Sequence, residues 1–390
     1  MHSVKTLNKI SARGTSLFGE NYSIGDSIEN PEAILVRSSQ VDTDSFSGDL
    51  LAVVRAGAGV NNITIDKASA KGVCVFNTPG ANANAVAELV FTALGVALRN
   101  IHKSLAWIGS LRGKEDKEIS EAVEKNKSAF VGAELVGKTI GVVGLGKIGV
   151  LVANGAIGRG MKVIAYEPYP SIGNMLMLNN TVKAVQSLEE VIAAADILTV
   201  HVPFMPATKD LLNETNMAHF KGSYLLNFAR NGIVSEAGVN AFLGKNKSNV
   251  YLTDFPSKAD LENEQIISFP HLGASTEEAE ENCAIMAVEQ LKDYLEFGIV
   301  RNSVNFPKIE SHPSASVKNR IVVVNNDVPN MIALISKVFG DAHINISSFK
   351  NESNGKIGYN IIDIDTAVPQ SLIDMLKKTQ SIIRVRVIEF

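Results

Sequence analysis

The stretch from Thr139 to Gly149, TIGVVGLGKIG, limits the possible folds of this chain more than any other. Its first five residues form an apolar run, apart from the hydroxyl of Thr139, and indicate a buried parallel strand, which runs into Gly144, Gly146 and Gly149 at the spacing G-x-G-x-x-G. In such a unit the first glycine makes a tight turn, the second lets the backbone approach a pyrophosphate, and the third lets the following helix pack closely on the strand. The stretch therefore predicts a dinucleotide site at the N-terminus of a helix.

A second expected strand, Lys162 to Tyr166, ends in Glu167. A carboxylate at the end of this strand accepts hydrogen bonds from the ribose hydroxyls of adenosine and repels a 2′-phosphate. The sequence therefore predicts NAD, rather than NADP, as the cofactor. The alternative interpretation is a tight glycine turn in an ordinary βα unit that binds no ligand.

Length and composition narrow the class of protein. A chain of 390 residues is too long for one compact core, so two or three domains are expected. The net charge of −4 gives no general attraction to nucleic acid or anionic membranes, so an anionic substrate needs local cations. No apolar segment suits a membrane span or a signal peptide, and we expect a cytoplasmic protein. The two cysteines, Cys74 and Cys283, lack metal-type spacing, and no metal is expected.

Short apolar runs separated by mixed polar segments indicate βα units of parallel sheets. Three such runs precede the glycine motif, at 33–36, 50–54 and 73–76, and we expect a doubly wound, flavodoxin-like domain there. After Glu167 the alternation continues and completes a Rossmann sheet of about seven strands. The expected later strands are residues 183–185, 197–202, 223–228, 249–255 and 266–269.

The last part of the chain has a different rhythm. Residues 274–297 read as an amphipathic helix that returns the chain to the first domain. The tail indicates the element order βαββαβ, which is a ferredoxin-like arrangement. We therefore expect a substrate domain at 1–97 with 276–305, an NAD-binding domain at 98–275, a linker at 306–319 and a C-terminal domain at 320–390.

Polar residues stand where the expected strands end. In open α/β sheets, ligands bind beyond the carboxyl ends of the strands. In the first domain these residues are Arg37 and Arg55, which are equally well interpreted as solvated loop cations, and in the second they are Arg230, Asp254 and His271. The loops after the first three apolar runs are therefore candidates for one wall of a site.

Seven segments resemble the D-isomer-specific 2-hydroxyacid dehydrogenases, and the resemblance that they carry extends over nearly the whole chain. They are VRSS at 36–39, RAGAGVNNI at 55–63, NTPGANANAVAE at 77–88, GLGKIG at 144–149, HVPFMPATKDLLN at 201–213, NFARNGIVSEAG at 227–238 and PHLGAST at 270–276. The resemblance is strongest to members that oxidise 3-phospho-D-glycerate to 3-phosphohydroxypyruvate, the first step of L-serine biosynthesis. The tail resembles an ACT regulatory domain.

The resemblance implies roles for individual residues. Arg230 binds the substrate carboxylate, which an arginine fork matches. His271 is the acid–base residue for the hydroxyl proton, and NAD takes the hydride. Arg37 is matched to the phosphate of the substrate. The substrate-binding residues are Arg37, Arg55, Gly57, Ala58 and Gly59. The cofactor-binding residues are Gly144, Gly146, Lys147, Ile148, Gly149, Glu167, His201, Val202, Pro203, Phe228, Ala229, Asp254, Gly273 and Ala274.

Two positions depart from the family pattern. Members usually carry a glutamate shortly after the aspartate that corresponds to Asp254, and it pairs with the histidine and raises its pKa. Ala259 occupies that position here, and Asp254, Asp260 and Glu262 remain as alternative substitutes. Where the family often has a hydroxyl residue, this chain has Ala58.

The resemblance also implies partners. A homodimer or homotetramer is expected, and L-serine is the expected effector of the tail, with Asn325, Asp327 and Asn345 at the matching positions. The null hypothesis for the tail is a dimerisation module without an effector. Two other functions remain open for the chain: another D-2-hydroxyacid dehydrogenase, acting on glycerate, hydroxypyruvate or 2-hydroxyglutarate, and a redox-sensing NAD-binding regulator.

Overall fold

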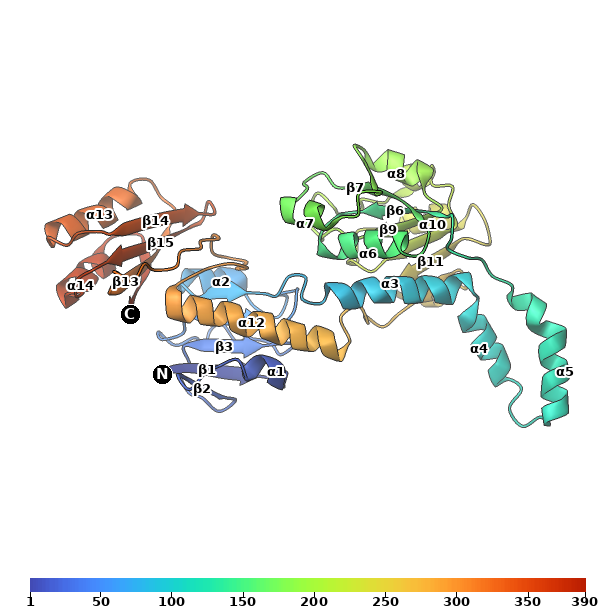
Figure 1. The fold of residues 1–390 in the computed structure, drawn as a ribbon, viewed down its shortest axis with the longest axis horizontal. Helices are drawn as coiled ribbons and strands as arrows, with labels where there is room; N and C mark the ends of the chain where they lie inside the picture. Colours follow the sequence, from blue (N-terminus) through green and yellow to red (C-terminus); the bar gives the residue numbers. More distant parts are fainter. The chain divides into compact units, whose positions relative to one another are not determined.

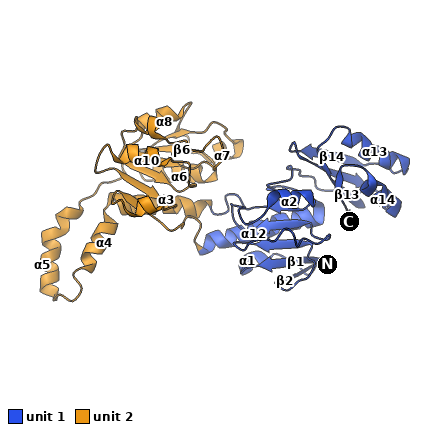
Figure 2. Ribbon diagram, turned by 180° about the vertical axis from the view of Figure 1, so that it is seen from behind, with its two compact units in different colours: residues 1–82, 277–390 blue, residues 83–276 orange.

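The computed structural model describes residues 1–390, which form two compact units (Figure 2). Unit 1 contains residues 1–82 and 277–390, and unit 2 contains residues 83–276. The chain therefore enters unit 2 after the first sheet and returns to unit 1 for the rest of its length. No single helix is long and apolar enough to cross a membrane, and only the helix pair at 83–98 and 101–109, bent by 62°, has sufficient length and apolar composition when taken together.

Unit 2 is built on seven parallel strands in the spatial order β12-β11-β10-β9-β6-β7-β8. They are β6 (Thr139–Val143), β7 (Lys162–Tyr166), β8 (Lys183–Val185), β9 (Ile197–Val200), β10 (Tyr224–Asn227), β11 (Val250–Thr253) and β12 (Ile266–Ser268). The order reverses between β6 and β9, as in a Rossmann fold, so the ligand crevice is expected beyond the ends of these two strands. The sheet of seven that the sequence predicts is confirmed.

Helices cover both faces of this sheet, which explains why its strands are continuous apolar runs. One face packs against α3 and α6, and the other against α8 and α10. The helices of unit 2 are α3 (Ala83–Leu98), α4 (Ile101–Gly109), α5 (Asp116–Asn126), α6 (Lys147–Ile157), α7 (Ile172–Met177), α8 (Leu188–Ala194), α9 (Glu214–Met217), α10 (Glu236–Leu243) and α11 (Lys258–Leu261), with a 3₁₀ turn at Lys127–Phe130. α4 and α5 have no buried residues and extend away from the sheet (Figure 1).

The first sheet of unit 1 has five parallel strands in the order β2-β1-β3-β4-β5. Its elements are β1 (His2–Leu7), α1 (Ala12–Thr15), β2 (Tyr22–Gly25), β3 (Ala33–Val36), β4 (Ala52–Arg55), α2 (Ile65–Ala70) and β5 (Cys74–Phe76). This is the flavodoxin-like order, whose reversal lies between β1 and β3. The helix α12 (Glu277–Phe297) returns to this sheet and buries Cys283, Ala287, Leu291 and Leu295.

The C-terminal segment of unit 1 forms an antiparallel sheet in the order β14-β15-β13-β16. Its elements are β13 (Asn319–Asn326), α13 (Met331–Asp341), β14 (Ser348–Ser353), β15 (Ile357–Ile364), α14 (Gln370–Lys378) and β16 (Ile382–Glu389). One face of the sheet packs against α13 and α14. The other face contributes Val322 and Tyr359 to the core that contains Phe76 and Tyr294, so the C-terminal sheet shares a core with the N-terminal one.

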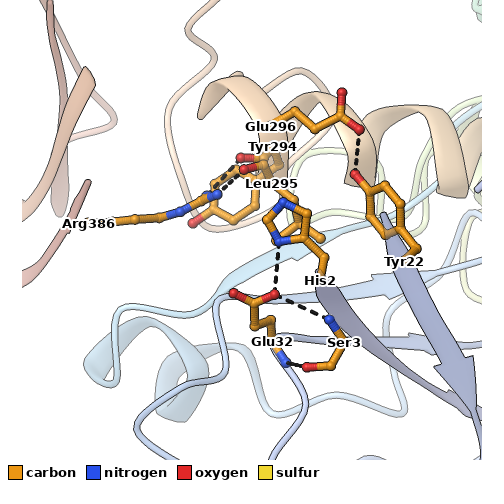
Figure 3. A network of polar contacts seen from close by, with 8 residues as sticks. All are labelled: His2, Ser3, Tyr22, Glu32, Tyr294, Leu295, Glu296 and Arg386. Atoms are coloured by element: carbon orange, nitrogen blue, oxygen red, sulfur yellow. Dashed lines mark hydrogen bonds and ion pairs between the residues drawn. The ribbon is translucent and has the colours of Figure 1, made fainter. Parts of the chain in front are cut away.

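The C-terminal sheet also caps the end of α12. Arg386 on β16 donates hydrogen bonds to the carbonyl oxygens of Tyr294, at 2.8 Å, and Leu295 (Figure 3). The hydroxyl of Tyr359 donates to the carbonyl of Gly298 at 2.8 Å. The last carbonyls of a helix have no partner within the helix. The carbonyl of Tyr294 also accepts from the N–H of Gly298 at 2.9 Å, so the C-terminal sheet adds further donors at the end of α12.

Candidate active site

The glycine-rich turn after β6 has the geometry of a phosphate site. Gly144 has φ +95°, and a Cβ atom there lies 2.8 Å from the carbonyl oxygen of His201. A Cβ atom on Gly149 lies 1.9 Å from the carbonyl oxygen of Gly144. Both positions therefore require glycine. Gly146 has no atom within 4 Å of its Cβ position and directly precedes α6, whose first residues are Lys147 and Ile148, so a phosphate has room at the helix N-terminus.

Glu167 lies beside this turn. Its carboxylate accepts hydrogen bonds from the backbone N–H of Leu145 and of Tyr169, both at 2.9 Å. A carboxylate has about four lone-pair sites, so two such bonds leave capacity for ribose hydroxyls. The arrangement fits the adenosine end of NAD.

His201 follows β9, on the other side of the strand reversal. The side chain is buried, its Nε2 lies 3.0 Å from the hydroxyl of Thr199, and its Nδ1 has no hydrogen-bond partner. Burial lowers the pKa of His201 to about 3, so the ring is neutral near pH 7. A buried ring nitrogen without a partner next to the glycine turn fits a contact with a bound cofactor. Val202 and Pro203 continue this edge, and Val202 lies against Gly144.

Arg230 lies at the carboxyl end of β10, after Phe228 and Ala229. The buried side chain of Asn227 shapes this turn, since it accepts from the N–H of Ala229 at 3.2 Å and donates to the carbonyl of Arg230 at 2.9 Å. The exposed guanidinium of Arg230 donates to the carbonyl of Ala229 at 2.7 Å. The group has five N–H donors, so it can still bind a carboxylate bidentately. Asn227 was not singled out from the sequence, and its one signal there is a polar residue that ends a buried strand.

His271 is presented by a strained turn after β12. Its φ is +57°, its ring is exposed, and Phe255 packs edge-on to it with 5.0 Å between centroids. Asp254, which is 1% exposed, accepts from the N–H of Leu272 at 2.7 Å and of Gly273 at 2.8 Å. Burial raises the pKa of Asp254, and these two N–H groups oppose the rise. Asp254 therefore holds the turn that contains His271 and that ends at Gly273, the residue before Ala274.

None of the three alternative acids hydrogen-bonds with the imidazole of His271. Asp254 uses both oxygens on the turn, and Asp260 accepts from the N–H of Ser257 at 2.8 Å in a capping box. Glu262 caps the C-terminus of α11 through its backbone. Within unit 2, the ring of Phe255 is the contact that orients the imidazole.

Arg37 follows β3, at the strand reversal of the first sheet. Its Nη2 lies 2.5 Å from Oε1 of Glu280 on α12. The loop after Arg37 is held by Asn8 at the end of β1, whose side-chain oxygen accepts from the N–H groups of Ser38 at 3.2 Å and Ser39 at 2.9 Å. Because ligands bind at such a reversal, Arg37 is well placed to receive an anion. Neither Asn8 nor Glu280 was singled out from the sequence.

Arg55 supports the neighbouring loop. Its Nε donates to the carbonyl of Arg37 at 2.9 Å, and a Cβ atom on Gly59 lies 2.6 Å from its Nη1. The carbonyl of Ala58 accepts from Asn77 at 2.6 Å, and that of Gly57 accepts from the N–H of residue 78 at 3.0 Å. The guanidinium of Arg55 thus fills the loop that the two glycines keep open.

Two of the three residues predicted to bind an effector line one groove of about 410 Å³ on the C-terminal sheet. Asn325 is 2% exposed and accepts from the side chain of Asn360 at 2.8 Å, while Asp327 accepts from the hydroxyl of Ser353 at 2.5 Å. Asn345 lies in the segment before β14 and does not line this groove.

Comparison with known proteins identifies relatives across most of the chain. Residues 96–275 match the family described as D-isomer specific 2-hydroxyacid dehydrogenase, NAD binding domain. D-3-phosphoglycerate dehydrogenase of Haemophilus influenzae is 32% identical over 87% of this chain and 81% of that protein. The Bacillus subtilis protein of the same name is 34% identical over 75% of this chain but only 55% of its own length.

Solved structures share the fold. The NAD⁺-bound 3-phosphoglycerate dehydrogenase of Entamoeba histolytica covers 78% of this chain and 98% of its own, with a TM-score of 0.60 and 24% identity. A D-mandelate dehydrogenase of Rhodotorula graminis covers 80% and 99%, with a TM-score of 0.65 and 21% identity. By its sequence relatives, this chain belongs to the D-isomer-specific 2-hydroxyacid dehydrogenase family and is an NAD-dependent oxidoreductase.

Proposed function

We propose that the chain oxidises 3-phospho-D-glycerate to 3-phosphohydroxypyruvate with NAD, the first step of L-serine biosynthesis. The observation that carries this proposal is the 32% identity to a D-3-phosphoglycerate dehydrogenase over 87% of the chain, which spans both units. The arginine at the strand reversal of unit 1 supports it, because a phosphorylated substrate needs a cation besides the one that binds its carboxylate.

In this reaction Arg230 binds the carboxylate next to the reacting alcohol and polarises the carbon–oxygen bond. His271 removes the hydroxyl proton at its imidazole, and the turn held by Asp254 keeps the ring at the edge of the sheet. Bound NAD supplies the hydride acceptor. The groups at Gly146, Glu167 and His201 hold that cofactor in unit 2.

A second candidate is an NAD-binding redox sensor without catalytic turnover. The observation that favours it is the imidazole of His271, which has no carboxylate partner in unit 2. The imidazole of His271 is exposed at the carboxyl edge of the sheet, and Arg230 follows β10 at the same edge, so catalysis is the better-supported proposal.

The deciding experiment is steady-state reduction with NADH of 3-phosphohydroxypyruvate, hydroxypyruvate and 2-oxoglutarate. We expect the phosphorylated compound to have the highest kcat/KM. A preference for either of the others means another 2-hydroxyacid dehydrogenase, and NADH binding without turnover of any of the three means a sensor.

We infer that the protein forms a homodimer through α4. This helix has no buried residue, and it exposes Ile101, Leu105 and Ile108 by 39%, 63% and 41% at helical spacing. Such a stripe is typical of a helix that packs against a partner. Light scattering of the wild type and of Leu105→Glu tests this: the wild type should have twice the mass of one chain or more, and the variant should dissociate.

We propose that the C-terminal segment is an ACT domain and that an amino acid, with L-serine as the first candidate, binds its groove. The element order βαββαβ supports the ferredoxin-like fold. Asp327 on the groove wall is a counter-ion for an ammonium group. Calorimetric titration of L-serine into the wild type and Asp327→Ala tests the proposal; no binding heat in the wild type leaves the domain with an assembly role.

A further inference from the structure

The ion pair between Arg37 and Glu280 lies at the edge where ligands of unit 1 bind. Arg37 follows β3 at the strand reversal, and Glu280 lies near the start of α12. Their side chains are both 43% exposed, and 2.5 Å separates Nη2 from Oε1. The guanidinium is therefore accessible to a ligand, but one of its terminal nitrogens already serves a carboxylate.

A second observation shows how the charges gather at this edge. Cys283, one helical turn after Glu280, is buried, and burial raises the pKa of its thiol. The charges of Arg37, Arg55 and Glu280 all act on this thiol. The cations Arg37 and Arg55 and the anion Glu280 therefore lie around Cys283. The negative charge of Glu280 offsets half of the positive charge that an anionic ligand would meet there.

We propose that Glu280 is a specificity-determining residue that competes with the phosphate of the substrate for Arg37, an inference that rests on the proposed function. A phosphate carries about −1.5 to −2 charges at pH 7 and prefers a bidentate arginine. Arg37 keeps further N–H donors for this phosphate, but the carboxylate of Glu280 offsets the charge of the guanidinium, and the two anions repel each other. Glu280 therefore weakens the binding of phosphorylated substrates and leaves unphosphorylated ones nearly unaffected.

An acid near the start of a helix also stabilises the helix itself, and the chain offers a matched control for this second effect of Glu280. Acids there stabilise the helix dipole, and Glu281 is the next residue of the same helix. The carboxylate of Glu281 pairs at 2.7 Å with Arg13, which lies on α1. This ion pair does not include Arg37. Replacing Glu281 removes an equivalent helix charge without touching the arginine of the site.

The test compares Glu280→Gln, Glu280→Asp and Glu281→Gln with the wild type in NADH-dependent reduction of 3-phosphohydroxypyruvate and hydroxypyruvate. In Glu280→Gln we expect KM for the phosphorylated compound to fall about two- to fivefold, the range measured for exposed ion pairs, with kcat unchanged. Its KM for hydroxypyruvate should stay at the wild-type value. Glu280→Asp, which keeps the charge, and Glu281→Gln should both retain the wild-type KM.

Three results overturn the inference. They are an unchanged or higher KM for 3-phosphohydroxypyruvate in Glu280→Gln, an equal fall for both substrates, and the same fall in Glu281→Gln. Thermal melting of each variant verifies that α12 is folded. The proposed function fails in a different way, namely when the wild type itself turns over hydroxypyruvate but not its phosphorylated form.

Discussion

Among single residues, His271 is the one we propose as the acid–base group for the hydroxyl proton, while the hydrogen on the reacting carbon goes to NAD as hydride. Its turn has φ +57°, and Asp254 ties the two following N–H groups to the end of β11. The side chain is exposed at the carboxyl edge of the sheet, where substrates of such folds bind. Its position therefore depends on the backbone of the turn rather than on a carboxylate partner.

Replacing His271 with Ala should lower kcat by about 10²- to 10⁴-fold, the usual contribution of general acid–base catalysis, with KM little changed. Steady-state reduction of 3-phosphohydroxypyruvate measures this. His219→Ala, at an exposed histidine outside the strand-end loops, is the control and should retain the wild-type kcat. A wild-type kcat in His271→Ala moves the acid–base role to another group.

The buried His201 predicts a pH dependence of stability. Its pKa is about 3 in the folded state, below the value of 6.5 for an exposed histidine. Between these values the unfolded chain binds a proton that the folded chain does not, so stability is present above pH 6.5 and is lost as the pH falls toward 3. From pH 7 to pH 4.5 the loss due to this group is about 2–3 kcal/mol.

Urea unfolding of the wild type and His201→Gln at these two pH values measures the effect. The glutamine side chain does not titrate, so the variant should lose less stability on acidification than the wild type does. Equal losses in both proteins would show that His201 is accessible to protons in the folded state.

Among the elements, the βα turn after β6 contains one glycine that the fold requires, Gly149, and one that leaves room for the cofactor, Gly146. Gly149→Ala places a Cβ atom 1.9 Å from the carbonyl oxygen of Gly144, so the turn must distort, and both the melting temperature and NADH binding should fall. Gly146→Ala meets no atom within 4 Å. It should melt close to the wild type and raise the Kd for NADH about tenfold or more, because its methyl group occupies the approach of the pyrophosphate.

Fluorescence titration with NADH and thermal melting of the two variants form a matched pair. The interpretation fails if Gly146→Ala binds NADH as the wild type does, or if Gly149→Ala is as stable as the wild type.

The sequence predicts the elements best where burial is strongest. The central strands of unit 2, β6, β9, β10 and β11, are buried on both faces, and α3 buries ten of its sixteen residues, so the apolar pattern predicts these elements. β1 and β2 were missed, since Val4 and Tyr22 are their only buried residues and β2 is an edge strand. Because β1 is not predicted, the sequence also does not predict that the strand order reverses between β1 and β3, next to Arg37.

In the candidate site, local sequence motifs predict the polar residues that follow the strands. They do not predict which distant residues these side chains contact. The pairing of Arg37 with Glu280 joins residues 243 positions apart, and no local spacing encodes it. The engagement of both oxygens of Asp254 with the turn at 272–273 depends on how two strand ends meet in space. The sequence could therefore propose three acids for His271 without excluding any of them.

At the scale of the whole molecule, the C-terminal sheet is part of the core of unit 1. The close-up in Figure 3 shows Arg386 reaching the carbonyl end of α12, next to the contacts of His2 with Glu32 and of Tyr22 with Glu296. The opposite end of α12 carries Glu280. One helix thus joins the C-terminal sheet to the residues around Arg37.

Arg386→Ala should destabilise the protein by about 1.5–3 kcal/mol, since a charged donor to buried carbonyls is lost. Lys337→Ala, which breaks an exposed ion pair with Asp341 on α13, is the control and should change stability by less than about 0.5 kcal/mol. Urea unfolding measures both. Equal effects of the two substitutions would mean that the C-terminal sheet does not support α12.

We propose that this NAD-dependent enzyme acts on a phosphorylated 2-hydroxyacid whose phosphate binds Arg37. The most direct measurement is the ratio of kcat/KM for 3-phosphohydroxypyruvate to that for hydroxypyruvate, with NADH, in the wild type and in Arg37→Ala. We predict a ratio of about ten or more in the wild type, the equivalent of 1.4 kcal/mol, and a ratio near one in the variant. A wild-type ratio near one, or an unchanged ratio in Arg37→Ala, would mean that Arg37 does not bind a substrate phosphate.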